Sequence, residues 1–317
     1  MKVAIAGCGV MGSTHAAAYK AKGVEVEAVC DRDSARAGEL ARRFGCAAYP
    51  GLGELLVAHS PDIVSICTPG AGHLDAILRA CAKKCAIVCE KPFVVDMNEA
   101  RAAAKAVSDA GVVFRIGFKM RYESVYAAAA EVVRSGEIGA LRYVFISHFQ
   151  PSSEPPWYMD IGVTTELLIH SFDIAGWLFG RLPRSVRMTS SYELGKSGED
   201  KSMVELDYAE GRKAFVVGGY MPGFPPIRGK HDFVFQFIGE KGYVAGKRNG
   251  SVAVFSPARV ESFVPAEVNA FEQEMADVLR AVAGEEAGGA TLEDALRSQR
   301  ILEAALSSAK KGAAESL

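Results

Sequence analysis

Strand and helix patterns alternate regularly through the first 117 residues, and few folds accommodate this order. Runs of consecutive apolar residues, typical of strands buried on both faces, are separated by segments with a helical period. Parallel strands joined by right-handed helical crossovers satisfy such an order, so the pattern predicts an α/β doubly wound parallel sheet with helices on both faces. Strands are expected over 3–6, 24–30, 63–67, 86–89 and 112–117, and helices over 13–20, 34–44, 52–59 and 97–110.

A glycine-rich turn follows the first predicted strand and opens the first helix. Glycines at this spacing allow a tight turn, close approach of the main chain to a pyrophosphate, and close packing of helix on strand. The helix N-terminus adds free N–H groups and a partial positive charge. The context predicts a dinucleotide-binding Rossmann domain, in which the phosphate contacts come from Gly7, Gly9, Val10, Met11 and Gly12.

The acid that ends the second predicted strand bears on which dinucleotide binds. A carboxylate at Asp31 would accept hydrogen bonds from ribose hydroxyls and repel a 2′-phosphate, which favours NAD over NADP. The guanidinium of the adjacent Arg32 could instead bind that phosphate. We therefore expect NAD as the cofactor, with NADP as the alternative.

Two further segments follow strands on the same rim of the predicted sheet, where ligands bind in such folds. They are Thr68-Pro69-Gly70-Ala71-Gly72-His73 and Glu90-Lys91-Pro92. A lysine beside a nicotinamide would be partly desolvated and could donate hydrogen bonds to a substrate oxygen. A lysine in an ordinary surface turn is the alternative for Lys91. The residues expected to contribute to the cofactor site here are Thr68, Pro69, His73, Glu90 and Lys91.

Charge and composition exclude several classes of protein. The 317 residues include 36 lysines and arginines against 38 acids, with no basic block, so a nucleic-acid footprint is not visible. No apolar run approaches the length of a membrane span, and the start MKVAIAG enters a strand rather than a signal-peptide core. We expect no membrane partner and a cytoplasmic protein.

All seven cysteines lie in the first 89 residues, at strand-like and helix-like positions. An odd, scattered set is typical of small buried side chains in a reducing compartment. Cys81, Cys85 and Cys89 are evenly spaced, but a helix ends and a strand begins between them, so they should not share a face. We therefore expect no metal site.

The pattern changes after residue 117, which suggests a nucleotide-binding domain over 1–118 and a second domain over 119–317. Short, often alternating strands separated by glycines and charges predict a mostly antiparallel open sheet in an α+β domain. Such a sheet usually buries its uncovered face against a partner, so we expect a homodimer or homotetramer. Strands are expected over 141–149, 185–192, 202–208, 213–218, 232–238, 243–245 and 252–255, and helices over 125–134, 265–283 and 291–311.

One apolar segment of this second domain, residues 164–177, has a helical period and carries three polar side chains. Glu166, His170 and Asp173 are spaced i, i+4 and i+7, which predicts that they share one face of a helix. A neighbouring carboxylate would raise the basicity of the histidine and orient its ring. The spacing is equally compatible with a solvated stripe.

Five motifs occur together in an order that resembles one known family. They are GCGVMGSTH, CTPGAGH, CEKP, GFKMRY and an acid-xxx-His-xx-Asp helix followed by WLFG. The chain resembles the Gfo/Idh/MocA family, the oxidoreductases related to glucose-fructose oxidoreductase and inositol dehydrogenase. The resemblance runs over essentially the whole chain, including terminal helices that return to the first domain.

The resemblance implies roles for several residues. Lys91 matches the catalytic lysine of the EKP motif, and the bond from Lys91 to Pro92 is expected to be cis. His170 matches the histidine that acts with that lysine on the substrate hydroxyl. His73 matches a histidine of the family in its loop, and His15 matches another common position, where we expect packing near the cofactor.

Two residues depart from the family pattern. Glu166 stands where many members carry an aspartate, so its reach is one methylene longer and the substrate class does not carry over from the family. Gly70 stands where members often have an asparagine, which weakens a nicotinamide-side contact at that position.

Together these observations predict an NAD-dependent dehydrogenase or reductase of a polyol, sugar or sugar derivative. His170 would act as general base, Glu166 would orient it, and Lys91 would hold and polarise the substrate oxygen. The alternatives are a redox-neutral, NAD-retaining glycosidase-type enzyme and a non-catalytic NAD-binding sensor. Substrate contacts are proposed, against a purely structural role, for Arg121, His148, Tyr158 and Asp173.

Overall fold

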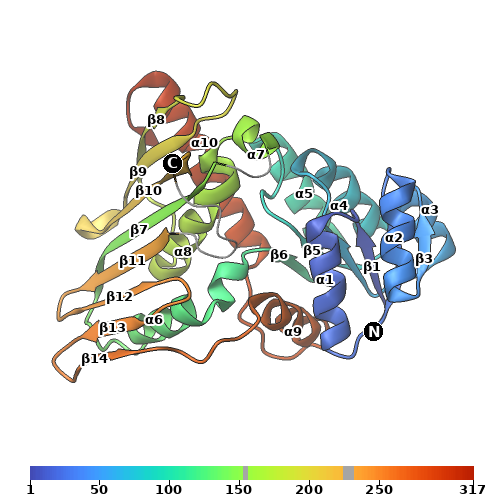
Figure 1. Ribbon diagram of the computed structural model, residues 1–317, viewed down its shortest axis with the longest axis horizontal. Helices are drawn as coiled ribbons and strands as arrows, with labels where there is room; N and C mark the ends of the chain where they lie inside the picture. Colours follow the sequence, from blue (N-terminus) through green and yellow to red (C-terminus); the bar gives the residue numbers. More distant parts are fainter. Residues whose placement is uncertain (153–155, 224–231) are drawn as a thin grey trace. The chain divides into compact units, whose positions relative to one another are not determined.

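The computed structural model describes residues 1–152, 156–223 and 232–317, and only the main chain of 156–158 and 232. The chain forms two compact units, shown in Figure 1. The first comprises Met1–Lys119 and Asn269–Leu296, and the second comprises Met120–Val268 and Arg297–Leu317. Within the described ranges, no helix combines the length and apolarity that a membrane crossing requires.

The first unit is a parallel sheet with its helices in alternation along the chain. Its strands are β1 (Val3–Ala6), β2 (Val26–Cys30), β3 (Ala47–Tyr49), β4 (Ile63–Ile66), β5 (Ala86–Cys89) and β6 (Phe114–Ile116). Its helices are α1 (Val10–Ala21), α2 (Ser34–Phe44), α3 (Leu52–Ala58), the short 3-10 turn η1 (Gly70–Gly72), α4 (His73–Ala82), α5 (Met97–Ala110) and α9 (Ala270–Val282).

The strand order of this sheet is β3-β2-β1-β4-β5-β6, with every described pair parallel. The order reverses direction between β1 and β4, which is the point where ligands bind in such folds. Helix α9 packs beside α1 (Figure 1), and its Met275 and Val278 join Ile5 and Tyr19 in one buried core. The predicted Rossmann fold class is confirmed.

The second unit contains the remaining elements. Its helices are α6 (Ser124–Arg134), α7 (Pro156–Ile161), the π-helical η3 (Thr164–Leu168), α8 (Ile169–Phe179) and the 3-10 turn η4 (Ala209–Gly211). Its strands are β7 (Leu141–Pro151), β8 (Ser185–Ser191), β9 (Lys201–Asp207), β10 (Lys213–Met221), β11 (Asp232–Gly239), β12 (Tyr243–Lys247), β13 (Val252–Phe255), β14 (Val260–Phe263) and β15 (Glu315–Ser316). The turn η2 (Lys119–Tyr122) and helix α10 (Leu292–Lys311) contain two of the three points where the chain passes from one unit to the other, and the third lies between β14 and α9.

These strands form one mixed sheet in the order β14-β13-β12-β11-β7-β10-β9-β8-β15. Its described pairs are antiparallel apart from β7 with β10, which confirms the predicted mostly antiparallel sheet. Helices α6 and α8 cover one face, where Val204 and Leu206 are buried, while Met203 of the same strand is 59% exposed on the other. From the sequence alone, the alternation along β9 did not show which of its two faces is buried. In the structure, the buried face is the one that carries Val204 and Leu206.

The structure departs from the expected secondary structure in a few places. β3 spans three residues and β15 two, too few to show a period in the sequence. The strand β14 and the helix α7 were not expected, and α9 begins at Ala270 rather than at residue 265. Asn269 explains that start, because its side chain accepts hydrogen bonds from the main-chain N–H groups of Phe271 and Glu272 as an N-cap.

Candidate functional site

The three motif glycines of the turn after β1 have different surroundings. Gly7 has φ +96°, and a Cβ there would lie 2.7 Å from the main chain of Cys67. A Cβ on Gly12 would lie 1.9 Å from the Gly7 carbonyl oxygen, so the chain's own packing requires both glycines. Gly9 has nothing within 4 Å of an added Cβ. This open surface at the start of α1, where helical N–H groups lack partners within the helix, fits a dinucleotide phosphate.

Asp31 is fixed on the same rim of the sheet by two main-chain donors. The N–H of Cys8 donates to its Oδ2 at 2.7 Å, and the N–H of Asp33 donates to its Oδ1 at 2.9 Å. The carboxylate therefore stands between the ends of β1 and β2, beside the glycine turn. The adjacent Arg32 is exposed.

The loop after β4 is tied to the turn after β5 by a buried histidine. Nε2 of His73 lies 2.7 Å from the Thr68 carbonyl oxygen, and Nδ1 lies 2.9 Å from that of Pro92. A Cβ on Gly70 would lie 3.2 Å from Cγ of Pro92, so a larger side chain there would press on the proline. The hydroxyl of Thr68 is buried and has no hydrogen-bond partner within the described residues, which suits a ligand at this rim.

Lys91 stands two residues after the end of the fully buried strand β5, and the Lys91–Pro92 peptide bond is cis, as the resemblance implied. The main-chain N–H of Lys91 donates to Oε2 of Glu90 at 3.1 Å. Burial would raise the pKa of Glu90, but the hydrogen bond and charge of His15 lower it below its usual range. A carboxylate is therefore held directly behind the lysine.

In the second unit, the segment that carries His170 is not a continuous α-helix. Thr164–Leu168 is π-helical, and the α-helix begins at Ile169. The expectation of one regular α-helix over this segment is therefore wrong: Glu166 lies in the π-helical turn, whereas His170 lies in the first turn of the α-helix. Single π-helical turns within helices occur frequently at functional sites.

An acid that the sequence analysis did not single out holds the start of this π-helical turn. Glu199 is 4% exposed, and its Oε1 accepts the main-chain N–H of Thr164 at 2.8 Å. A Cβ on Gly162 would lie 2.3 Å from its Oε2, so a glycine is required there. The glycines at 162 and 198, which stand beside the two ends of this contact, are the sequence feature that could have indicated a close approach of these two segments.

Three of the proposed substrate contacts are buried and engaged within the second unit. Arg121 donates from Nε to Asp173 Oδ2 at 2.9 Å in a two-pronged ion pair, and its guanidinium lies 5.3 Å from the Trp177 ring centre. His148 is fully buried between the hydroxyls of Tyr126 and Ser171, each 3.0 Å from a ring nitrogen. These contacts favour the structural role that the sequence had left as the alternative. The side chain of Tyr158 lies outside the described residues.

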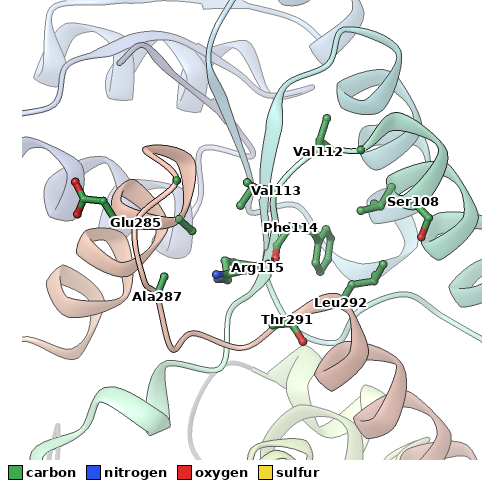
Figure 2. Close-up of a pocket in the computed structure, with 13 residues that line it drawn as sticks. Ser108, Val112, Val113, Phe114, Arg115, Glu285, Ala287, Thr291 and Leu292 are labelled. Atoms are coloured by element: carbon green, nitrogen blue, oxygen red, sulfur yellow. Dashed lines mark hydrogen bonds between the residues drawn. The ribbon is translucent and has the colours of Figure 1, made fainter.

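A pocket of about 490 Å³ in the first unit is lined by none of the candidate cofactor residues. Figure 2 shows Phe114 and Arg115 of β6 facing it from one side and Ala287 and Thr291 from another, with Ser108 near the end of α5. It lies toward the amino end of β6. Dinucleotides bind beyond the carboxyl ends of the strands, so this pocket is not the candidate cofactor site.

The fold and the rim define a two-unit α/β protein whose first unit is built to bind a dinucleotide. Residues 1–118 match the family model "Oxidoreductase family, NAD-binding Rossmann fold", and residues 130–315 match "Oxidoreductase family, C-terminal alpha/beta domain". The chain belongs to this Gfo/Idh/MocA family of NAD-binding oxidoreductases, as its motifs predicted.

Similar proteins agree with this assignment. The rhizopine catabolism protein MocA of Rhizobium meliloti is 30% identical over 319 residues, which cover 96% of this chain and 93% of that protein. Inositol 2-dehydrogenase of Rhizobium meliloti (strain 1021) is 30% identical over 262 residues, which cover 80% and 78%. An oxidoreductase from Agrobacterium radiobacter, solved with NAD+, L-tartaric acid and magnesium, has the same fold, with a TM-score of 0.91, 22% identity and coverage of 100% and 98%.

Proposed function

We propose that this protein is an NAD-dependent dehydrogenase or reductase that acts on a CH–OH group of a polyol, a sugar or a sugar derivative. The observation that carries the proposal is Lys91, held by a buried carboxylate at the rim that also carries the glycine turn and Asp31. The similarity to inositol 2-dehydrogenase supports a polyhydroxylated substrate.

The chain's own residues have distinct roles in this proposal. Bound NAD would supply the redox chemistry by accepting or returning a hydride. Lys91 would donate hydrogen bonds to the substrate oxygen and stabilise the negative charge that develops there. His170 would take the hydroxyl proton as general base, and Glu166 would orient the imidazole. The family resemblance supports the last two assignments.

The cofactor contacts extend over the rim of the first unit. The main chain from Gly7 to Gly12 would hold the pyrophosphate, and Asp31 would accept from the ribose hydroxyls. Thr68, Pro69, His73 and Glu90 would shape the nicotinamide side. Asp31→Ala should erode the preference for NAD over NADP, and an unchanged ratio of the two kcat/KM values would refute the ribose assignment.

The test of the function is nicotinamide absorbance on purified protein with inositols, aldoses and other sugar derivatives, using NAD and NADP separately. Lys91→Ala should lower kcat/KM by about a thousandfold while NADH affinity is kept. Lys83→Ala, an exposed lysine of the same unit, is the matched control. Bound cofactor without turnover on any substrate would contradict the proposal and favour the redox-neutral enzyme or the sensor.

We further propose that a second copy of the chain covers the open face of the mixed sheet. Tyr143 and Phe145 of β7 are each 39% exposed there, and the Phe145 and Phe215 rings stack 5.0 Å apart. A contiguous aromatic surface of this kind is typical of a protein interface. Phe145→Glu should lower the molar mass measured by light scattering, and an unchanged mass would exclude this face.

We also propose a reducing compartment, such as the cytoplasm, as the place where the chain works. All seven cysteines are free thiols, and burial raises the pKa of several of them, including Cys8 and Cys30 to about 12. Thiol titration of denatured protein should return seven reactive groups; fewer would indicate disulfides and contradict the assignment.

A further inference from the structure

A chain of buried polar contacts lies behind Lys91 within the first unit. His15 of α1 is fully buried, with Nδ1 2.7 Å from the Ser65 hydroxyl of β4 and Nε2 3.0 Å from Oε1 of Glu90. The other oxygen of Glu90 accepts the main-chain N–H of Lys91. The imidazole is therefore linked to the lysine through one carboxylate.

The space for this carboxylate is limited on the side of β6. A Cβ on Gly117 would lie 3.0 Å from the carboxyl carbon of Glu90, and the Gly117 N–H donates to the Cys89 carbonyl at 2.7 Å. Glu90 is thus held between His15 and Gly117. A change in either neighbour would move the carboxylate and, with it, the main chain of Lys91.

A carboxylate buried to this degree needs a compensating charge. Burial would lower the pKa of His15, but the Cys67 sulfur and the Glu90 carboxylate outweigh it and raise that pKa well above its usual range. The Ser65 hydroxyl contacts the histidine, the Phe271 ring centre lies 6.2 Å from that of the imidazole, and the Glu274 carboxyl interacts with the His15 charge. Beyond them, the Tyr19 hydroxyl lies beside Ser65, and the Lys119 ammonium acts on Glu274.

Glu274 completes the group from α9. It is 3% exposed, and neither carboxyl oxygen has a hydrogen-bond partner within the described residues. Burial raises its pKa to about 8, against the opposing charge of His15, so the carboxyl is neutral at pH 7. With His15 positive and Glu90 negative, the three side chains His15, Glu90 and Glu274 together then carry no net charge.

We propose that His15 is a positioning residue for Lys91: as an imidazolium, it holds the Glu90 carboxylate in the place where that carboxylate anchors the lysine. The inference rests on the proposed function, in which Lys91 contacts the substrate. It assigns chemistry to a histidine for which the sequence had suggested only packing near the cofactor.

The first test does not depend on turnover. Nitrogen NMR of protein labelled at its six histidines should show both ring nitrogens of His15 protonated at pH 7.5. Glu90→Gln should abolish that state, and Glu274→Gln should leave it. A neutral His15 ring in the wild-type protein would overturn the proposal. The signal that disappears in His15→Gln belongs to His15. If this variant does not fold, the other histidines are substituted one at a time, and the signal that remains in every variant belongs to His15.

The second test separates charge from hydrogen bonding. In His15→Gln the amide N–H still donates to Glu90, but the positive charge is lost, so kcat should fall by about tenfold while the Kd for NADH changes by less than about threefold. The acid limb of the pH profile should move to higher pH, because the variant removes the His15 charge that lowers the pKa of the Glu90 carboxylate. An unmoved limb would contradict the positioning role.

The matched control is His59→Gln, which also removes an imidazole near a glutamate of the first unit. Nδ1 of His59 lies 3.3 Å from Oε1 of Glu27, away from Lys91. This variant should change neither the His15 spectrum nor the pH profile. If no substrate is turned over, the proposed function fails, while the spectrum still decides the charge of His15.

Discussion

Each unit buries a histidine between a serine hydroxyl and a second side chain, and the two histidines differ in the charge of that second partner. In the first unit, Nε2 of His15 faces the Glu90 carboxylate at 3.0 Å. In the second, Nε2 of His148 faces the Tyr126 hydroxyl, also at 3.0 Å. Burial raises the pKa of Tyr126, so that hydroxyl stays neutral. The comparison teaches that similar hydrogen-bond geometry can join a buried histidine to a carboxylate in one place and to a neutral hydroxyl in the other.

Replacing each of the two histidines by leucine should show the largest difference in stability between the two sites. His15→Leu leaves Glu90 as an uncompensated buried carboxylate, so it should lower the free energy of unfolding by about 3–5 kcal/mol. His148→Leu leaves two neutral hydroxyls without a partner and should cost about 1–3 kcal/mol. Urea unfolding followed by far-UV circular dichroism measures both, and equal losses would contradict the difference in charge.

Gly117→Ala should displace the Glu90 carboxylate that faces His15, while the histidine itself is kept. The new Cβ, 3.0 Å from the Glu90 carboxyl carbon, forces that carboxylate to move, at a cost of about 1–3 kcal/mol. Gly9→Ala is the control for stability, because its Cβ meets nothing within 4 Å. Thermal unfolding of cofactor-free protein should separate the two variants, and a cost at Gly9 as large as that at Gly117 would argue against the crowding of Glu90.

Glu274→Gln should remove a pH dependence from the stability of the first unit. The folded pKa of Glu274, about 8, lies above its value in an unfolded chain, so the stability it contributes is present at low pH and is lost as pH rises through 8. Between pH 6 and 8 the wild-type protein should therefore lose about 1–2 kcal/mol more than the variant. Denaturation midpoints at both pH values measure this.

Glu272→Gln is the matched control for that experiment, since Glu272 lies on the same helix and its side chain is 32% exposed. It should reproduce the wild-type pH dependence. If Glu274→Gln also did so, the Glu274 carboxyl would not be a buried neutral acid.

Tyr126→Phe should have the smallest effect. It removes the hydroxyl that faces His148 and keeps the ring, whose centre lies 4.7 Å from that of Phe235, so the loss should be about 1 kcal/mol. Because the hydroxyl that the variant removes stays neutral, the loss should be the same at pH 6 and pH 8. A loss that grew with pH would indicate a charged partner for His148.

Much of the fold could be predicted from the sequence because its periods are local. The bounds of α2, β5, α5 and β13 agree with the expectation, since each is a buried run or an amphipathic segment with clear ends. The π-helical turn before His170 could not be predicted, because it depends on contacts such as that of Glu199 with the Thr164 N–H, 35 residues apart.

The candidate site likewise has a part that could be predicted from the sequence and a part that could not. The glycine turn, Asp31 and Lys91 follow from motifs that stand at strand ends. The partners of His15 lie 50 and 75 residues along the chain, and no period connects them. Glu274 had a weak signal, because it stands between Phe271 and Val278 on the buried stripe of α9, where an acid is unusual.

Trp177, between the guanidinium groups of Arg121 and Arg134, gives the molecule an optical label on one unit alone. The chain has two tryptophans, Trp157 and Trp177, and both belong to Met120–Val268. Indole emission therefore reports melting of the second unit, whereas the helical ellipticity reports both. If the two curves do not coincide, the units unfold independently, and a single midpoint would not describe this protein.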